Sequence, residues 1–169
     1  PIPTFWHLPI ICNAEGKKLS KRDFGFSLGD LKNSGFLPEA INNYLGIIGG
    51  SFKNEIMSLE ELVKEINFEN MHPASNIKYD VEKLRWINHK WISLYPSEKL
   101  AILTRPFLES KRPEAEKLEE KEFINLLKIV QTDLVVLPDV STELAFYFKK
   151  PEITKEQWLQ NLSGDELEK

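Results

Sequence analysis

Apolar side chains recur every three or four positions through most of the chain after residue 27, which is the spacing of an amphipathic helix. This pattern predicts helices over 27–35, 38–48, 58–66, 80–95, 96–107, 113–131, 142–148 and 154–159. The first part of the chain differs, because prolines at positions 1, 3 and 9 exclude a helix there. Residues 1–11 are expected to form an edge strand, and residues 8–19 a hairpin. The predicted fold class is mainly α, with a short β element at the N-terminus.

Polar residues and helix breakers mark where the predicted helices begin and end. Ser58 and Glu61 have the spacing of a capping box, in which each side chain bonds the other residue's backbone N–H. Asp80 is expected to cap the helix over 80–95, and Pro106 to close or kink the helix that follows. The core-facing residues of the helix over 80–95 are expected to be Leu84, Ile87, Trp91 and Leu94, while Arg85, Asn88 and His89 fall towards another face.

The composition is that of a globular protein with a core of useful size, since 41% of the 169 residues are hydrophobic and 28% are charged. No apolar run approaches the length that crosses a bilayer, and we expect no membrane partner. The single cysteine, Cys12, excludes an internal disulfide and fits a reducing compartment, so the expected location is the cytoplasm.

The net charge of −4 conceals a basic segment in the middle of the chain. Residues 70–112 contain eight lysines and arginines against four acidic residues, whereas residues 113–169 are acidic. A basic face of this kind can hold RNA phosphates, but a solvated helix surface fits the pattern equally well. The change of charge places a domain boundary near residues 97–113. The aromatic residues assigned to the core, rather than to base stacking, are Trp86, Trp91, Phe146 and Phe148.

One stretch carries most of the candidate chemistry, namely Gly16-Lys17-Lys18-Leu19-Ser20-Lys21-Arg22-Asp23. Its glycine turn, four cationic side chains and hydroxyl are suited to binding phosphate. A solvated turn has the same composition, and charge alone does not separate the two. A Walker-type loop is excluded, because the upstream glycine and the following helix start are missing. The histidines and Cys12 lack neighbours at ligand spacing, so neither a metal site nor a nucleophilic cysteine is predicted.

The same loop begins an ordered series of motifs. Lys18-Leu19-Ser20-Lys21-Arg22 resembles the second signature motif of class I aminoacyl-tRNA synthetases, in the KLSKR form found in glutamyl-tRNA synthetases. The stretches over 35–45 and 79–88 resemble that family's "GylPEAl-NyL" and "fd-eKL-w-N" helices. The match covers most of residues 5–148, in order and with family-like spacing. The chain therefore resembles the bacterial type of glutamyl-tRNA synthetase.

The resemblance implies a two-step reaction, in which the family joins glutamate to tRNA through glutamyl-adenylate formed from ATP with Mg²⁺. Lys21 would be the catalytic residue that steadies negative charge as pyrophosphate leaves, with Lys18 and Ser20 assisting in ATP binding. Leu19 completes the motif and Arg22 shapes the loop. The implied partners are tRNA(Glu), glutamate and ATP, with tRNA(Gln) left open, and the protein would be a monomer. No residue of this chain is expected to bind the metal.

The resemblance also divides the chain. Residues 1–96 would hold the end of the catalytic domain, with the KLSKR loop, and a stem-contact helical domain. Residues 97–169 would be the first part of a helical cage domain that binds the anticodon. The residues expected to contact tRNA are Lys83, Arg85 and Lys90. At Gln131-Thr132-Asp133 the chain departs from the arginine that some members use to read the anticodon.

The first class I motif, a HIGH-type sequence, does not occur in these residues. We therefore expect a carboxy-terminal fragment of a longer enzyme, inactive by itself. Two alternatives stay open, which are a stand-alone RNA-binding or interaction module and the related glutaminyl-tRNA synthetase. The second fits less well, because its anticodon region is a β-barrel, whereas residues 113–169 have a helical pattern.

Overall fold

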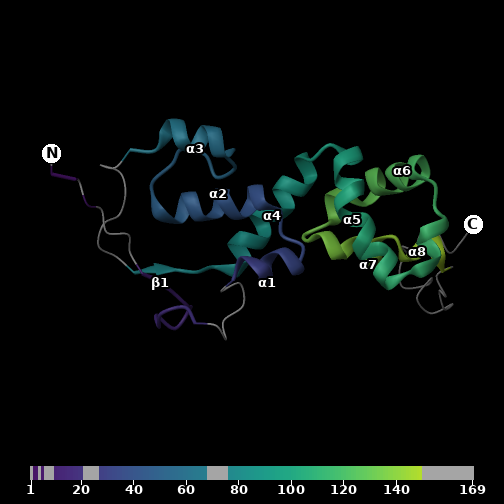
Figure 1. Ribbon diagram of the computed structural model, residues 1–169, viewed down its shortest axis with the longest axis horizontal. Helices are drawn as coiled ribbons and strands as arrows, with labels where there is room; N and C mark the ends of the chain where they lie inside the picture. The colour runs from purple at the N-terminus through teal and green to yellow at the C-terminus, as the bar shows by residue number, and fades with distance from the viewer. Residues whose placement is uncertain (1, 4, 6–9, 21–26, 68–75, 150–169) are drawn as a thin grey trace, which may run out of the picture.

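The structure, a computed structural model, describes residues 2, 3, 5, 10–20, 27–67 and 76–149 and is mainly helical (Figure 1). The strands within these ranges are β1 (Ile11–Cys12) and β2 (Ile77–Lys78). The α-helices are α1 (Leu28–Asn33), α2 (Pro38–Gly49), α3 (Leu59–Glu65), α4 (Val81–Leu94), α5 (Ser97–Lys111), α6 (Glu120–Val130), α7 (Val140–Glu143) and α8 (Ala145–Phe148). Short 3₁₀ helices are η2 (Pro113–Lys117), η3 (Gln131–Asp133) and η4 (Leu137–Asp139). The mainly α class is confirmed; the helix predicted over 154–159 lies outside the described residues, and the strand over 1–11 is described only in part.

Side-chain caps begin α1, α3 and α4, and those at Ser58 and Asp80 are the ones that the sequence predicts. Ser27 Oγ accepts a backbone N–H from the first turn of α1 at 3.1 Å. At α3, Ser58 Oγ accepts the Glu61 N–H at 3.2 Å, and the Glu61 carboxylate accepts the Ser58 N–H at 2.7 Å. Asp80 Oδ1 accepts a first-turn N–H of α4 at 3.0 Å. Because each oxygen satisfies a donor that the first turn leaves unpaired, these residues fix where the helices begin.

Gly35 makes the tight turn between α1 and α2. Its φ is +82°, a left-handed angle that side chains disfavour. A Cβ at this position would lie 2.2 Å from Pro138 Cδ and 2.9 Å from Leu137 N. The Gly35 carbonyl also accepts the Leu137 N–H at 3.1 Å. Both the backbone angle and the close approach of η4 therefore require glycine.

The strands join two distant parts of the chain. β1 and β2 pair in parallel, with Ile11 opposite Ile77 and Cys12 opposite Lys78. Cys12 also forms an antiparallel bridge with Lys18. The predicted hairpin is thus confirmed within residues 10–20, whereas the parallel partner was not predicted. A parallel pairing over so long a connection leaves no turn signature in the sequence.

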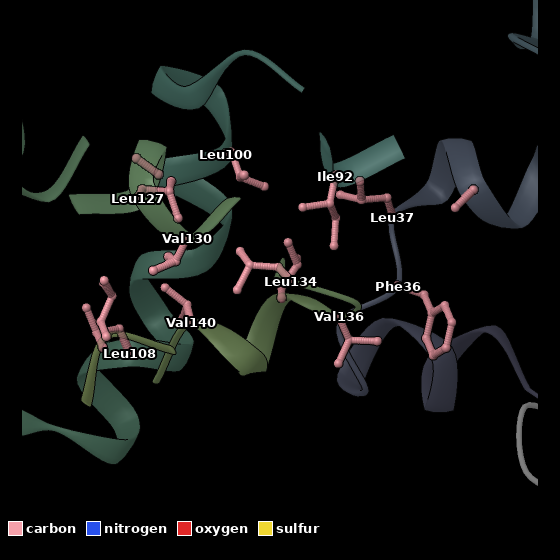
Figure 2. Packing of buried hydrophobic residues seen from close by; sticks show 14 of the residues in the cluster. Phe36, Leu37, Ile92, Leu100, Leu108, Leu127, Val130, Leu134, Val136 and Val140 are labelled. Atoms are coloured by element: carbon pink, nitrogen blue, oxygen red, sulfur yellow. The ribbon is translucent and has the colours of Figure 1, made fainter. Parts of the chain in front are cut away.

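α4 lies between two groups of elements, with the strands, α2 and α3 on one side and α5–α8 on the other, and α1 lies below it in the view of Figure 1. The described buried apolar side chains nevertheless form one cluster that extends through both groups. Figure 2 shows Leu134 and Val136, from the segment between η3 and η4, lying between Val130 of α6 and Leu37 before α2. The cluster crosses the boundary predicted at residues 96 and 97, and that boundary stays a prediction.

The predicted faces of α4 are wrong at two positions. Leu94, expected in the core, is 69% exposed, and Asn88, expected on another face, is fully buried. Asn88 Oδ1 accepts the Leu37 N–H at 2.8 Å, and Nδ2 donates to the Val135 carbonyl at 2.6 Å. A hydrophobic pattern places asparagine outside the core, because asparagine is polar. The pattern contains no information on the distant backbone groups that hydrogen-bond the buried Asn88 amide.

Two predicted helix boundaries also differ from the structure. Pro106 does not close α5, which continues to Lys111 with the proline inside it. Buried residues on both sides of the proline hold this helix against the core, namely Leu100, Ala101, Thr104 and Leu108. The helix predicted over 113–131 is divided, because residue 118 is extended between η2 and α6. None of the described helices is both long and apolar enough to cross a membrane.

Candidate functional site

The described part of the lysine-rich loop is a turn held by the side chain of Asn13. Asn13 Oδ1 accepts the Glu15 N–H at 3.2 Å and the Lys17 N–H at 3.0 Å. The Asn13 backbone N–H donates to the Lys17 carbonyl at 2.8 Å, and its carbonyl accepts the Gly16 N–H at 2.9 Å. Gly16 supplies the left-handed angle, with φ of +79° and nothing within 4 Å of a Cβ. The turn is therefore fixed by local bonds and needs glycine for its backbone angle alone.

The residues after this turn present polar groups to solvent. Lys17, Lys18 and Ser20 are exposed, and Leu19 is half-buried. The Leu19 N–H donates to the Ile11 carbonyl at 3.0 Å, which continues the pairing started by Cys12 and Lys18. Lys18 therefore lies in a short, hydrogen-bonded ribbon, and Ser20 comes directly after it. Lys21 and Arg22, the other two polar residues of the motif, lie outside the described residues.

The ribbon is joined to the start of α4. Tyr79, the residue after β2, donates its N–H to the Cys12 carbonyl at 2.7 Å. The next residue, Asp80, donates its N–H to Tyr44 Oη at 2.6 Å. The rings of Tyr44 and Tyr79 meet edge to face with centroids 5.6 Å apart. Burial is the main cause that raises the pKa of Tyr44 to about 12 and the pKa of Tyr79 above its ordinary value. Both phenols are neutral below pH 10, as buried hydroxyls require.

The outer face of α4 brings together two of the three predicted tRNA contacts. Lys83 Nζ lies 4.5 Å and Lys90 Nζ 5.7 Å from the ring centre of Trp86. The third, Arg85, lies about 100° around the helix from Trp86, because successive residues rotate by that angle. It shares the side of His89, whose Nδ1 is 3.0 Å from the Leu134 carbonyl oxygen. The structure therefore groups Lys83 and Lys90 and places Arg85 apart from them.

Trp86 is the functional candidate that sequence reasoning missed. Its assignment to the core is wrong, because the residue is 37% exposed. Trp91, later in the same helix, is instead packed against the core, and its Nε1–H donates to Asn43 Oδ1 at 3.0 Å. A signal was available, since Lys83, Trp86 and Lys90 have the spacing of neighbours on one helix face.

Two arginines of the basic segment, Arg105 and Arg112, form hydrogen bonds within the chain. Arg105 donates through Nε to the Glu109 carboxylate at 2.7 Å and through Nη2 to the Leu118 carbonyl at 2.7 Å. Arg112 Nε donates to the Ser141 carbonyl at 3.0 Å. These guanidinium groups tie α5 to the segments that follow it, so they contribute less to an RNA-binding face than their number suggests.

The segment at Gln131-Thr132-Asp133 is anchored by its first residue. Gln131 Nε2 donates to the carbonyls of Ile92 and Tyr95, both at 2.8 Å, and Oε1 accepts from Ser97 Oγ at 2.8 Å. Gln131 therefore joins the end of α4 to the start of α5. Only Thr132 and Asp133 of the three present exposed side chains. Within the described residues, no three His, Cys, Asp or Glu side chains gather where they could hold a metal ion.

Comparison with known proteins identifies the class of the chain. Residues 1–86 match the family described as tRNA synthetases class I (E and Q), catalytic domain. This match covers half of the chain and includes the lysine-rich loop, α2 and the start of α4. The chain belongs to this family of class I tRNA synthetases.

Two curated relatives of the chain are both glutamate--tRNA ligases. The chain is 36% identical over 154 residues to a glutamate--tRNA ligase of Finegoldia magna, covering 90% of this chain and 31% of the relative. It is 36% identical over 149 residues to a glutamate--tRNA ligase of Akkermansia muciniphila, covering 86% of this chain and 33% of the relative. The chain thus spans about a third of the length of the curated relatives that it matches.

Solved structures agree with the sequence relatives. A glutamate tRNA ligase from Elizabethkingia meningosepticum in complex with its amino acid superposes with a TM-score of 0.78 at 25% identity, covering 98% of this chain and 36% of that one. A glutamate-tRNA synthetase from Elizabethkingia anophelis superposes with a TM-score of 0.79 at 25% identity, covering 99% of this chain and 37% of that one.

Proposed function

We propose that this chain is part of a glutamate--tRNA ligase that activates glutamate with ATP and transfers it to tRNA. The observation that carries the proposal is the KLSKR motif, whose first three residues lie at a ribbon that β2 joins to α4, in a chain whose relatives are glutamate--tRNA ligases. Lys18, Ser20 and Lys21 bind ATP, and Lys21 stabilises the negative charge that develops as pyrophosphate leaves. Mg²⁺ arrives with ATP, glutamate is the amino-acid substrate, and the longer protein works as a cytoplasmic monomer.

The rest of the chain contacts tRNA. Residues 1–96 form the end of the catalytic domain and the stem-contact domain, and residues 97–169 begin the helical anticodon-binding domain. Lys83 and Lys90 contact the tRNA backbone from the outer face of α4, with Arg85 contributing from the neighbouring side. Lysines at these positions suit phosphate, since each neutralised phosphate releases a bound counterion.

The glutaminyl-tRNA synthetase alternative is less well supported. The described residues 113–149 contain α6–α8 and η2–η4 and form no strand, which fits a helical cage better than a β-barrel. A stand-alone RNA-binding module would explain the outer face of α4, but it leaves the KLSKR motif without a role. Aminoacylation of purified tRNA(Glu) and tRNA(Gln) by the full-length protein distinguishes these readings, and no charging of either tRNA would contradict the ligase proposal.

Replacing Lys21 tests the role of the loop directly. In the full-length protein, Lys21→Ala is expected to lower ATP–pyrophosphate exchange by at least about tenfold, because a charge contact made in the transition state is lost. Lys17→Ala is the matched control, since Lys17 is an exposed lysine of the same loop outside the motif. An exchange rate unchanged by Lys21→Ala, or lowered equally by both variants, would overturn the assignment.

A further inference from the structure

The outer face of α4 combines an aromatic ring with two cations. Trp86 is exposed, and the ammonium groups of Lys83 and Lys90 lie 4.5 Å and 5.7 Å from its ring centre. A nucleotide has a flat base beside a negatively charged phosphate. An exposed indole between two lysines offers a stacking surface and the neutralising charges together.

This arrangement is not required by the fold. The core side of α4 is formed by Leu84, Ile87, Asn88 and Ile92, all fully buried. Trp91 already supplies a packed indole whose N–H bonds Asn43. Trp86 lies on the opposite side of the helix from these contacts, and the lysine side chains leave more than a third of it exposed. A base can therefore reach the ring without disturbing the core, once the ammonium groups that lie over the ring move to the phosphates of the same nucleotide.

One of the two cations is already paired within the chain. Lys83 Nζ contacts the carboxylate of Glu55, from the segment between α2 and α3. Asn43 holds this segment in place, because its Nδ2 donates to the Glu55 carbonyl at 3.1 Å and its Oδ1 accepts the Met57 N–H at 3.1 Å. The carboxylate is thus positioned to compete with any phosphate that approaches Lys83.

We propose that Trp86 is a base-stacking contact for an unpaired nucleotide of the bound tRNA, with Lys83 and Lys90 binding its phosphates and Glu55 acting as the internal competitor. The proposal rests on the proposed function, since it specifies how the tRNA-contacting face of that ligase works. The excess of positive charge over residues 70–112, with eight lysines and arginines against four acidic residues, favours a polyanion as the partner. The exposed indole favours an RNA over an acidic protein segment, because every nucleotide carries a base that can stack.

The test is a titration of labelled tRNA(Glu) transcript with the 169-residue chain, at low and at moderate salt. Trp86→Ala and Trp86→Leu are expected to weaken binding by at least about fivefold, whereas Trp86→Phe keeps it within about twofold, because phenyl still stacks. Glu55→Gln is expected to tighten binding by about two- to fivefold by releasing Lys83. Ile102→Ala, an exposed apolar residue of α5, is the matched control and should leave the affinity unchanged.

Tryptophan emission gives a second measurement. Added tRNA should quench the emission of the wild-type chain more than that of Trp86→Phe, because a stacked base quenches the ring that it touches. Equal affinity of Trp86→Leu and Trp86→Phe would overturn base stacking, and so would equal competition by polyglutamate and by single-stranded RNA. No tRNA binding by the wild-type chain would overturn the proposal as well. The ligase proposal is judged separately, by aminoacylation with the full-length protein.

Discussion

The requirement for glycine differs between two residues that share nearly the same backbone angle. Gly16 and Gly35 have φ of +79° and +82°, but only Gly35 has other atoms where a Cβ would stand. Gly35→Ala is expected to lower the free energy of unfolding by about 2–4 kcal/mol, because strain and overpacking add. Gly16→Ala carries the strain alone and should cost about 1 kcal/mol. Denaturant unfolding of both variants measures the difference, and equal losses would show that the contact with Pro138 relaxes freely.

Tyr44 is expected to make stability depend on alkaline pH. Burial raises its pKa from an ordinary value of 10.0 to about 12, so the folded chain holds the proton more tightly than the unfolded chain does. Its contribution is complete below pH 10 and is lost as pH rises from 10 to 12, by about 3 kcal/mol in all. Tyr44→Phe should be less stable at neutral pH, because the Asp80 N–H loses its acceptor. The variant should also lose less stability between pH 9 and 11.5, and a slope as steep as that of the wild type would contradict the assignment.

At the scale of elements, Asn88 is the main polar link between α4 and the segment that precedes η4. Asn88→Ala leaves the Leu37 N–H and the Val135 carbonyl without their partner, so unfolding free energy should fall by about 2–4 kcal/mol. Ser93→Ala is the control, since Ser93 Oγ bonds only the His89 carbonyl of its own helix among the hydrogen bonds described. Its cost should stay within about 0.5 kcal/mol. Equal effects of the two variants, measured by denaturant unfolding, would mean that the Asn88 bonds add no stability.

The elements themselves were largely predictable, because their signals are local. The caps at Ser58 and Asp80 each depend on residues a few positions away, and both are found as predicted. The burial of Asn88 was not predictable, because its bonding partners lie 51 and 47 residues away. Hydrophobic spacing ranks side chains by type, whereas burial depends on which backbone groups the fold brings near.

At the scale of the whole molecule, the motif loop could be located from the sequence, but the strand pairing that connects it to α4 could not. The motif of residues 18–22 could be read directly, while the parallel pairing that joins its strand to the start of α4 has no local signature. The cluster of Lys83, Trp86 and Lys90 on the outer face of α4 was predicted only in part. Charge pointed to Lys83 and Lys90, but the rule that aromatic residues at helical spacing are core assigned Trp86 to the wrong side of α4.

The position of Cys12 allows thiol labelling to measure how often the lysine-rich loop and its strand open. The only thiol in the chain is 3% exposed, yet it lies outside the main hydrophobic cluster, on a strand held to β2 by a short pairing. Alkylation must wait until this strand detaches, so the labelling rate measures the local opening of the ribbon that carries the lysines. We expect this rate to change little in Asn88→Ala, because the strand opens without unfolding the core. A rate that rises with the global unfolding constant of that variant would show that the loop and the core open together.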